Sequence, residues 1–442
     1  MIVMKFGGSS VANRAQIEKV RAIVAAASDR TPVVVSSAHK GVTDALINTA
    51  RDAAAGEDDG GDMVIGKQTA VAESLGCSLD LLAPLFAEIR DLLRGIRLVR
   101  ELSPRSLDYI SSFGERMSVR CIADFFTREG LKAQAFDAWD LGFITDNNFG
   151  RARPLPDFPQ RLKDAFSTKV PTAAVPVITG FVGKNVGGDI TTLGRNGSDL
   201  TASLVGAGLD ASEVQIWSDT NGVMTADPGI VPTAQSIPHM RFDEAAELAF
   251  FGSRVLHPST LLPAIDKDIP VRVLNTNRPE HPGTAISASP PEREASFTSV
   301  AYKENQAVLT ISEPHMFESV GFLGRVFTTL AEHGAVLDMV ATSEVSVSVT
   351  SHDVAALRAA IPDLQAFGET DLKTGKAILA VVGRKIHHTP GIGARVMKSL
   401  AAAEVNIEMH SFGMASNNIS LVVDDAAIAT AVPALHDALF EA

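Results

Sequence analysis

The sequence of 442 residues has little of several features that would assign it to a common class. It contains two cysteines, Cys77 and Cys121, too few for a disulfide framework or a cysteine-rich metal site, so we expect two small buried side chains in the reducing cytoplasm. No run of about 18 apolar residues occurs, which predicts no membrane-spanning helix. The first residues also lack the basic and apolar stretches that are typical of a secretory signal.

A net positive charge is absent as well. The chain has 52 acidic and 39 basic residues and a net charge of −13, which argues against general binding to nucleic acids. The overall field of such a chain repels anionic ligands, so local cations and backbone N–H groups must attract them. Individual lysines and arginines in glycine-rich segments are therefore the first candidates for function.

The rest of the composition is that of an ordinary protein of several domains, with 45% apolar and 21% charged residues. Residues 2–4 form a short apolar run that ends in a pair of glycines, residues 14–27 carry an apolar stripe at helical spacing, and residues 33–35 form a second apolar run. Strand, glycine turn, helix and strand in this order predict an α/β domain with a mostly parallel sheet, which we place at residues 1–285.

The last third of the sequence contains an internal repeat with an offset of 70 residues. The repeated residues are Gly321, Arg325, Val326, Leu330, Ala331 and Met339, which recur as Gly391, Arg395, Val396, Leu400, Ala401 and Met409. Asp338 corresponds to Glu408 at the same offset. Each copy reads strand, helix, strand, strand, helix, which predicts a duplicated α+β module.

The predicted boundaries follow from this repeat. A segment rich in proline, glutamate and serine gives a linker at residues 286–297. We place the first module at residues 298–368 and the second at residues 369–442, and the second module can share strands with residues 298–312.

Two patterns resemble ligand sites but lack residues that such sites need. Residues 61–68 (G-D-M-V-I-G-K-Q) approach the phosphate-loop pattern, but Gln68 replaces the required hydroxyl and an acidic stretch precedes the segment instead of an apolar strand. His387 and His388 are adjacent, so on a strand they would point to opposite sides, and no further ligand accompanies them at a useful spacing. We therefore predict no metal site formed by the protein.

A glycine-rich segment follows the first apolar run. In residues 5–11 (K-F-G-G-S-S-V) the glycines let backbone N–H groups approach an anion, and Lys5 adds a positive charge. Taken alone, this segment is equally compatible with a tight turn between a strand and a helix.

A second glycine-rich segment, residues 191–199, precedes a helix that we expect from Leu200. Arg195 offers a planar fork for a carboxylate, whereas Ser198 and Asp199 could simply cap that helix.

Together with four other segments, the two glycine-rich segments resemble the aspartate kinase family. The six segments are residues 5–11 (K-F-G-G-S-S-V), 35–44 (V-S-S-A-H-K-G-V-T-D), 113–115 (F-G-E), 193–199 (L-G-R-N-G-S-D), 217–228 (W-S-D-T-N-G-V-M-T-A-D-P) and 251–258 (F-G-S-R-V-L-H-P). The resemblance implies the amino-acid-kinase fold, a mostly parallel sheet between helices, followed by two ACT-type, ferredoxin-like α+β domains. It also implies phosphorylation of the side-chain carboxylate of L-aspartate by ATP, with Mg²⁺ carried by the nucleotide, as the first step of lysine, threonine and methionine biosynthesis.

The resemblance also implies roles for the matching residues. Lys5 would bridge the transferring phosphoryl group, and Asp199 would orient groups at the reacting centre. The implied aspartate-binding residues are Ser37, Thr43, Glu115, Arg195 and Ser198, with Arg195 on the α-carboxylate and Glu115 on the α-ammonium group. The implied nucleotide-binding residues are Lys5, Gly7, Gly8, Ser9, Ser218, Asp219, Met224, Gly229 and Arg254.

Elementary chemistry agrees with this set of residues. The nucleophile is a carboxylate that is already ionised at neutral pH, so no general base is required. The difficulty is to bring one anion to another, and catalysis should rest on positioning and on neutralising charge.

The sequence departs from the family pattern on the nucleotide side. Many relatives carry Tyr where Met224 stands, Arg where Gly229 stands and Lys where Arg254 stands. These departures leave two alternatives: a non-catalytic amino-acid sensor, and a kinase for another small carboxylate. The intact Lys5 and Arg195 argue against the first alternative, and the Phe-Gly-Glu segment with the duplicated module argues against the second.

The first module resembles the effector-binding domain of lysine-sensitive relatives, which bind lysine at a dimer interface. The implied effector residues are Met316, Gly321, Phe322, Leu323, Asp338, Thr342, Ser343, Glu344 and Val345. Asp338 and Glu344 are suitable anions for an ammonium group, although threonine is an alternative effector and the apolar residues can equally form a core. We expect a homodimer or higher oligomer through the ACT domains.

Overall fold

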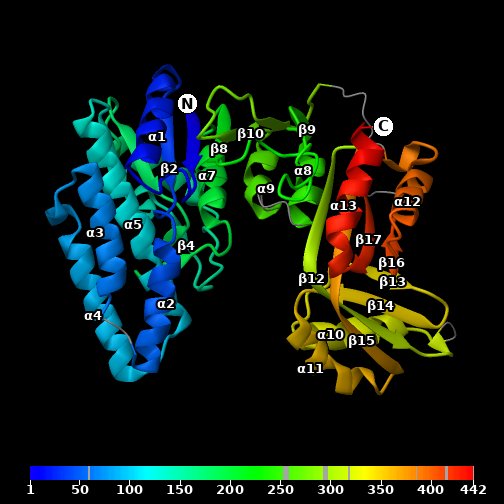
Figure 1. Ribbon diagram of the computed structural model, residues 1–442. Helices are drawn as coiled ribbons and strands as arrows, with labels where there is room; N and C mark the ends of the chain where they lie inside the picture. Colours follow the sequence, from blue (N-terminus) through cyan, green and yellow to red (C-terminus); the bar gives the residue numbers. More distant parts are fainter. Residues whose placement is uncertain are drawn as a thin grey trace. The chain divides into compact units, whose positions relative to one another are not determined.

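The computed structural model describes residues 1–57, 60–251, 258–291, 297–316, 319–384, 386–413 and 417–441. The chain forms two compact units (Figure 1). The first unit consists of Met1–Val223, Pro238–Phe242 and Val255–Pro290, and the second of Met224–Ile237, Asp243–Arg254 and Pro291–Ala442. None of the helices in the described part of the chain has both the length and the apolar character that crossing a membrane requires.

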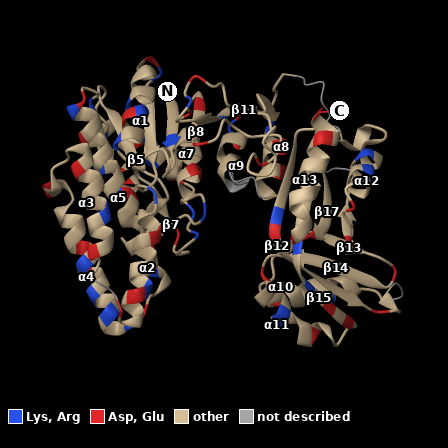
Figure 2. Cartoon of the chain, in the orientation of Figure 1, with Lys and Arg blue, Asp and Glu red and all other residues tan. Residues whose placement is uncertain are grey.

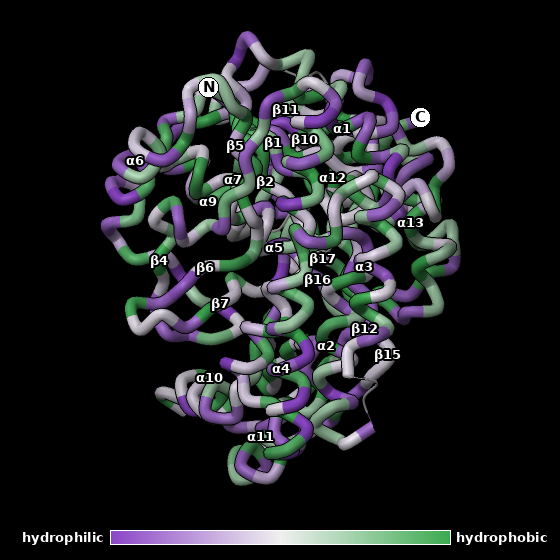
Figure 3. The backbone as a smooth tube through the Cα atoms, turned by 90° about the vertical axis from the view of Figure 1, so that its left-hand side faces the viewer, coloured by the Kyte–Doolittle hydropathy of each residue, from purple (hydrophilic) through white to green (hydrophobic). Residues whose placement is uncertain are grey.

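The first unit is built on an eight-stranded sheet. In pairing order its strands are β3 (Ala133–Phe136), β5 (Val175–Thr179), β2 (Pro32–Ser36), β1 (Ile2–Phe6), β8 (Glu213–Ser218), β10 (Val271–Asn275), β11 (Thr284–Ser287) and β9 (His239–Arg241). Neighbouring strands from β3 to β10 are parallel, and β11 is antiparallel to β10. The central strands are buried and mostly apolar, as expected for a sheet covered on both faces (Figure 3).

A small sheet and several helices complete the described part of this unit. The small sheet contains β4 (Ile144–Thr145), β6 (Val182–Asn185) and β7 (Ile190–Thr192). The helices are α1 (Arg14–Ala26), α2 (Val42–Ala55), α3 (Asp62–Leu75), α4 (Ala83–Val99), α5 (Pro104–Arg128), α6 (Phe158–Lys169), α7 (Gly197–Gly208) and α9 (Pro258–Asp266). Arginines and acidic residues are interspersed along the exposed side of α4, the usual pattern of a solvated helix (Figure 2).

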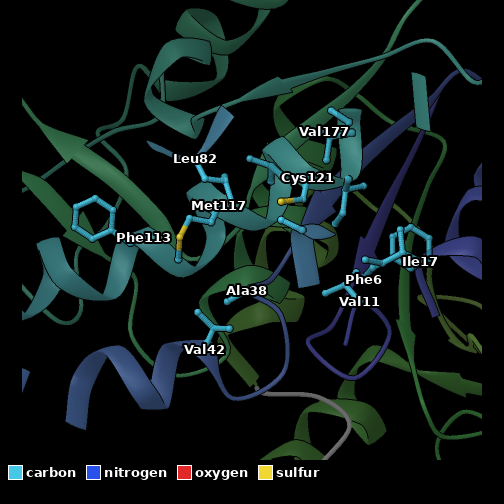
Figure 4. Close-up of a cluster of buried hydrophobic side chains, with 14 of the residues drawn as sticks. Phe6, Val11, Ile17, Ala38, Val42, Leu82, Phe113, Met117, Cys121 and Val177 are labelled. Carbon is cyan, nitrogen blue, oxygen red and sulfur yellow. The ribbon is translucent and has the colours of Figure 1, made fainter. Parts of the chain in front are cut away.

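The alternation of side chains along β1 assigns its two faces to different helices. Ile2, Met4 and Phe6 belong to the large apolar core that they form with α1 to α5, in which Phe6 lies near Ile17 (Figure 4). Residues at odd positions must then face the other side of the sheet, where α7 packs on β1. Lys5 is one of them, so the strand itself aims this lysine at α7.

Several local predictions can be compared with this structure. The helix α7 begins at Gly197 rather than at Leu200, so Ser198 and Asp199 lie in its first turn and Asn196 holds the N-cap position. The segment that approaches the phosphate-loop pattern is mostly the interior of α3, which begins at Asp62, and so contains no loop to cradle a phosphate.

The second unit contains a six-stranded antiparallel sheet. In pairing order its strands are β13 (Val340–Thr342), β14 (Ser346–Ser351), β12 (Ser299–Ser312), β15 (Glu369–Val382), β17 (Asn418–Asp424) and β16 (Met409–Ser411). Its helices are α8 (Phe242–Phe250, all but its first residue), α10 (Phe322–Glu332), α11 (Val354–Leu364), α12 (Ile392–Ala402) and α13 (Ile428–His436). The predicted order of strand, helix, strand, strand, helix is confirmed in both copies of the repeat.

The two long strands of this sheet take part in both copies. β12 and β15 pair over their whole length, from Ser299 opposite Val382 to Ser312 opposite Glu369. Residues 307–312 of β12 also pair with β14 of the first copy, whereas residues 376–382 of β15 pair with β17 of the second. The beginning of β12 therefore lies beside the second copy, and the beginning of β15 beside the first.

The argument from strand geometry does not apply to His387 and His388. They lie in a short 3-10 helix, Ile386–His388, and their ring centroids are 4.1 Å apart instead of on opposite sides of a strand. Because both residues precede α12 in a turn, the period of two that applies to strands does not describe them.

Candidate active site

A cavity of about 500 Å³ opens in the first unit, where β1 ends and α7 begins. It is lined by all the predicted catalytic and aspartate-binding residues: Lys5, Ser37, Thr43, Glu115, Arg195, Ser198 and Asp199. They come from β1, the segment after β2, the first turn of α2, the middle of α5 and the segment that begins α7. The parallel strands explain this convergence, because the carboxyl ends of β1 and β2 meet at one edge of the sheet.

An ion pair lies at the centre of the cavity. Lys5 Nζ is 2.5 Å from Asp199 Oδ1, and the two side chains are 11% and 9% exposed. Asp199 lies in the first turn of α7, where the N–H groups at the helix N-terminus stabilise a negative charge. This arrangement places a buried ammonium group beside the positive end of a helix, a suitable environment for a phosphoryl group.

Glu115 supplies a buried carboxyl group on another wall of the cavity. Its Oε1 accepts a hydrogen bond from the Ala38 N–H at 3.1 Å, while Oε2 has no hydrogen-bond partner among the described residues. Burial raises the pKa of Glu115 to about 8, although the hydrogen bond from Ala38 and the charge of Lys5 oppose the shift. A ligand ammonium group would satisfy the open oxygen and stabilise the carboxylate.

This raised pKa gives a pH-dependent stability with a definite sign. Between the ordinary value of 4.5 and about 8, folded Glu115 keeps a proton that the unfolded chain releases, so its contribution is present at low pH and is lost as the pH rises toward 8. We expect the urea midpoint of the wild type to fall between pH 5 and pH 8 relative to that of Glu115→Gln. Glu73→Gln, a change at an exposed glutamate, should follow the wild type, and parallel curves for all three would contradict the assignment.

Arg195 is held at the mouth of the cavity by an unusual stretch of backbone. Its neighbours Gly194 and Asn196 both have left-handed backbone angles, with φ of +83° and +55°, which glycine and asparagine tolerate best. The side chain is exposed and forms no ion pair with a described residue, so its guanidinium group can receive a carboxylate.

Sequence reasoning missed Asp108, which also lines the cavity. Its carboxylate accepts hydrogen bonds from the N–H of Gly150 at 2.9 Å and from the N–H and hydroxyl of Thr192 at 2.8 and 2.7 Å. Burial raises the pKa of Asp108, and these hydrogen bonds oppose the rise. The one available signal was a buried acid on an otherwise apolar stretch of α5, which ties this helix to the segment before Arg195.

The predicted nucleotide residues at the start of the chain form a turn beside the cavity. Gly7 donates its N–H to the carbonyl oxygen of Trp217 at 3.2 Å, which joins this turn to the end of β8. A Cβ atom on Gly7 would lie 3.4 Å from Lys5 Nζ and would fill the space next to the ammonium group. Gly8 and Ser9 continue the turn, and at the same edge of the sheet Ser218 ends β8 and the exposed Asp219 follows it.

The remaining predicted nucleotide-binding residues, Met224, Gly229 and Arg254, are not found at this edge of the sheet among the described residues. Met224 and Gly229 belong to the second unit, where Met224 forms an isolated bridge with Ser236 and Gly229 donates its N–H to Asp227 at 2.8 Å. Arg254 lies outside the described residues.

The predicted effector residues lie in the first copy of the repeat. Met316 and Phe322 are buried in its core, and Gly321 is the N-cap of α10. The exposed members of the set are Leu323, Thr342, Ser343, Glu344 and Val345. The side chain of Asp338 is 2% exposed and already paired, with its two carboxylate oxygens 2.7 and 2.8 Å from Lys303 Nζ.

Comparison with known proteins agrees with the geometry of both units. Residues 1–275 match the model of the amino acid kinase family, and residues 379–439 match that of an ACT domain. Aspartokinase 1, chloroplastic, of Arabidopsis thaliana is 36% identical over 456 residues, which cover 99% of this chain and 80% of that protein.

Two crystal structures of E. coli aspartokinase III are also similar. The complex with aspartate and ADP is 33% identical, with a TM-score of 0.85 and coverage of 100% of both chains. The complex with lysine and aspartate is 32% identical, with a TM-score of 0.76 and coverage of 100% of this chain and 99% of that one. The chain therefore belongs to the aspartate kinase family: it is an amino-acid kinase that carries a C-terminal ACT regulatory region.

Proposed function

We propose that the cavity transfers the γ-phosphoryl group of ATP to the side-chain carboxylate of L-aspartate. The observation that carries this proposal is the convergence of Lys5, Asp199, Arg195 and Glu115 on one cavity. Arg195 binds the α-carboxylate and Glu115 the α-ammonium group of aspartate, so that the side-chain carboxylate is directed toward Lys5. Ser37, Thr43 and Ser198 contribute hydrogen bonds to the substrate.

The reaction then requires no proton transfer. One oxygen of the aspartate side chain attacks the γ-phosphorus, the bond from that phosphorus to the bridging oxygen breaks, and ADP leaves with the bonding electrons. Lys5 neutralises the transferring phosphoryl oxygens, Asp199 fixes the position of Lys5, and the positive end of α7 favours the negative charge of the phosphoryl group.

The nucleotide occupies the edge formed by Gly7, Gly8 and Ser9 on one side and Ser218 and Asp219 on the other. The space beside Lys5 that a Cβ on Gly7 would fill fits a phosphate group. The described residues around this cavity provide no group of three acidic or histidine ligands, which favours Mg²⁺ bound mainly by the nucleotide phosphates. When bound, Mg²⁺ would neutralise phosphate charge; we propose no other task for it.

One assay tests this function. ATP, Mg²⁺ and aspartate are incubated with the protein and hydroxylamine, which traps an acyl phosphate as a hydroxamate. We expect hydroxamate from aspartate and an equal amount of ADP. Absence of hydroxamate from aspartate, with ADP formed from another small carboxylate or from none, would replace the proposal by one of the two alternatives described above.

We further propose that lysine is the effector of the ACT region. Asp338 is held internally by Lys303, so an effector ammonium group could reach it only by displacing or sharing that lysine. Glu344 is exposed in the turn between β13 and β14, beside the hydroxyl of Ser343, and is the better candidate for the ammonium group of lysine.

Replacing Glu344 should therefore weaken inhibition without changing catalysis. We expect Glu344→Gln to raise the lysine concentration for half inhibition about tenfold, since a charge-assisted hydrogen bond contributes roughly 1.5–3 kcal/mol. Initial rates at increasing lysine concentration provide the measurement, with Glu332→Gln on α10 as an exposed control in the same copy. An unchanged lysine response would exclude Glu344, and inhibition by threonine alone would exclude lysine as the effector.

The first ACT copy also supports the proposal of a homodimer. Large apolar side chains that are exposed in this copy include Val320, Leu323, Val336, Val340 and Val345. We propose that a second subunit covers some of these side chains, since apolar surface exposed on one chain is often buried where subunits meet. Light scattering should give at least twice the chain mass of 46.7 kDa, and a monomer mass would contradict the proposal.

A further inference from the structure

The fold of the first unit brings together the only two cysteines of the sequence. Cys77 follows Gly76, which caps the end of α3, and Cys121 lies 44 positions further along in α5, within the apolar core shown in Figure 4. The Cys77 thiol donates to the carbonyl oxygen of Cys121 at 3.6 Å, and the Cys121 thiol in turn donates to the sulfur of Cys77. Two thiols in contact can be joined as a disulfide, which neither cysteine could form alone.

Polar groups contact both sulfurs, although the pair lies at an apolar core. Arg128 Nη2 is 3.5 Å from Cys77 Sγ and also donates to the carbonyl oxygen of Leu75 at 2.8 Å, so the guanidinium group is held beside the sulfur. Gln68 Nε2 donates to Cys121 Sγ at 3.6 Å. A cation next to a sulfur is typical of a thiol that ionises readily, whereas a cysteine that only fills space has apolar neighbours.

The two thiols differ in acidity. The hydrogen bond from Cys121 and the charge of Arg128 lower the pKa of Cys77, although burial and Asp124 oppose this shift. The pKa of Cys121 is raised, because this thiol donates that hydrogen bond and is buried. Cys77 is therefore the cysteine that forms a thiolate, and Cys121 stays protonated beside it.

Access to solvent differs in the same direction. Cys77 is 6% exposed and lies between the exposed residues Gly76 and Ser78, whereas Cys121 is fully buried. A small neutral oxidant therefore meets Cys77 first. An acidic, accessible thiol with a second thiol beside it is the arrangement expected of a cysteine pair that responds to oxidants.

We infer that Cys77 and Cys121 form a site of reversible oxidation, at which hydrogen peroxide converts the two thiols to a disulfide. The Cys77 thiolate attacks one oxygen of the peroxide, the O–O bond breaks, and hydroxide leaves, so that Cys77 becomes a sulfenic acid. The Cys121 sulfur then attacks the Cys77 sulfur, the S–O bond breaks, and the hydroxyl group leaves with the Cys121 proton as water. The peroxide is reduced to water, and the two sulfurs are oxidised.

The disulfide would join the end of α3 to α5, the helix that carries Glu115. Exchange with an added thiol would break it again and restore both cysteines. The inference does not depend on the proposed function, because the oxidation uses neither ATP nor aspartate.

Mass spectrometry of the full chain tests the inference. The reduced protein is treated with hydrogen peroxide, the remaining thiols are blocked with N-ethylmaleimide, and a digest without reductant is searched for the peptide that joins Cys77 to Cys121. We expect this cross-link in the wild type and its loss when dithiothreitol is added. Cys121→Ser should stop at a sulfenic acid on Cys77 that dimedone captures, and Cys77→Ser should leave Cys121 unmodified.

An arginine variant tests the source of the reactivity. Arg128→Met should slow disulfide formation about fivefold, because a smaller fraction of Cys77 would be ionised. Arg161→Met is the matched control, since each of these arginines pairs with the aspartate four residues before it, but Arg161 does so on α6. This control should keep the wild-type rate.

Three results would overturn the inference. The first is a folded wild type that keeps both thiols under peroxide treatment that oxidises them in the urea-unfolded chain. The second is a disulfide between chains instead of within one chain, and the third is a sulfinic acid on Cys77 without the cross-link. Equal rates for Arg128→Met and Arg161→Met would contradict the role of Arg128 even where the disulfide forms.

Discussion

Replacing Lys5 by methionine is expected to lower kcat about a thousandfold, while the fold is kept. The change removes the one ammonium group that lies 2.5 Å from Asp199 at the centre of the cavity. Loss of a preorganised group that stabilises transition-state charge typically costs a factor of about 100 to 1,000, or roughly 3–4 kcal/mol of barrier. Methionine keeps most of the length and volume of the lysine chain, so the loss reports on charge rather than on packing.

A control for Lys5→Met must account for Asp199, which loses its ion-pair partner in this variant. Lys5→Met leaves the carboxylate of Asp199 buried without its cation, which could destabilise the first unit. The double variant Lys5→Met, Asp199→Asn removes both charges and should melt closer to the wild type while remaining inactive. Lys184→Met, which removes a lysine that stacks on Trp139 away from the cavity, should keep full activity. A folded Lys5→Met enzyme with more than about a tenth of wild-type kcat would contradict the role of Lys5.

Replacing Arg195 should weaken the binding of aspartate rather than that of ATP. We expect Arg195→Ala to raise the KM for aspartate about a hundredfold and to leave the KM for ATP within threefold, because two charge-assisted hydrogen bonds to the α-carboxylate are lost. Arg195→Lys keeps the charge but not the planar fork of the guanidinium group. Its KM for aspartate should lie between those of the wild type and Arg195→Ala, with an increase of about tenfold. Steady-state rates at varied aspartate and saturating ATP provide the measurement.

A second exposed arginine provides the control for Arg195→Ala. Arg151 is also an exposed arginine of the same unit, but it does not line the cavity, so Arg151→Ala should leave both KM values unchanged. An Arg195→Ala enzyme with a normal KM for aspartate would require another cation to bind the α-carboxylate. An effect on the KM for ATP alone would place Arg195 on the nucleotide instead.

The residues on the aspartate side were predicted from the resemblance of six segments to a known family, because Lys5 and Asp199 taken alone are equally compatible with a tight turn and a helix cap. Local rules explain how the fold presents them: the alternation along β1 directs Lys5 toward α7, and Asp199 lies in the first turn of that helix. The parallel order of β1 and β2 then brings Lys5 and Ser37 to one edge of the sheet. The start of α7 was predicted three residues too late because Ser198 and Asp199 resemble caps, whereas left-handed Asn196 takes that position.

Long-range packing accounts for what the sequence could not predict. Asp108 reaches Thr192, 84 positions away, and no spacing rule relates the two residues. Thr225 meets His436 across 211 positions, so the contribution of the regulatory unit to the segment after β8 is visible only in the folded chain. The segment of residues 217–228 is continuous in sequence, but its first part belongs to the first unit and its second part to the second unit.

The pairing of β12 with β15 has a consequence for how such a repeat can evolve. Each long strand gives one end to its own copy and the other end to the neighbouring copy. Deleting either copy would therefore remove an edge partner from the survivor and leave unpaired backbone groups exposed. Excision of one copy would therefore damage the other, so the two copies are structurally interdependent.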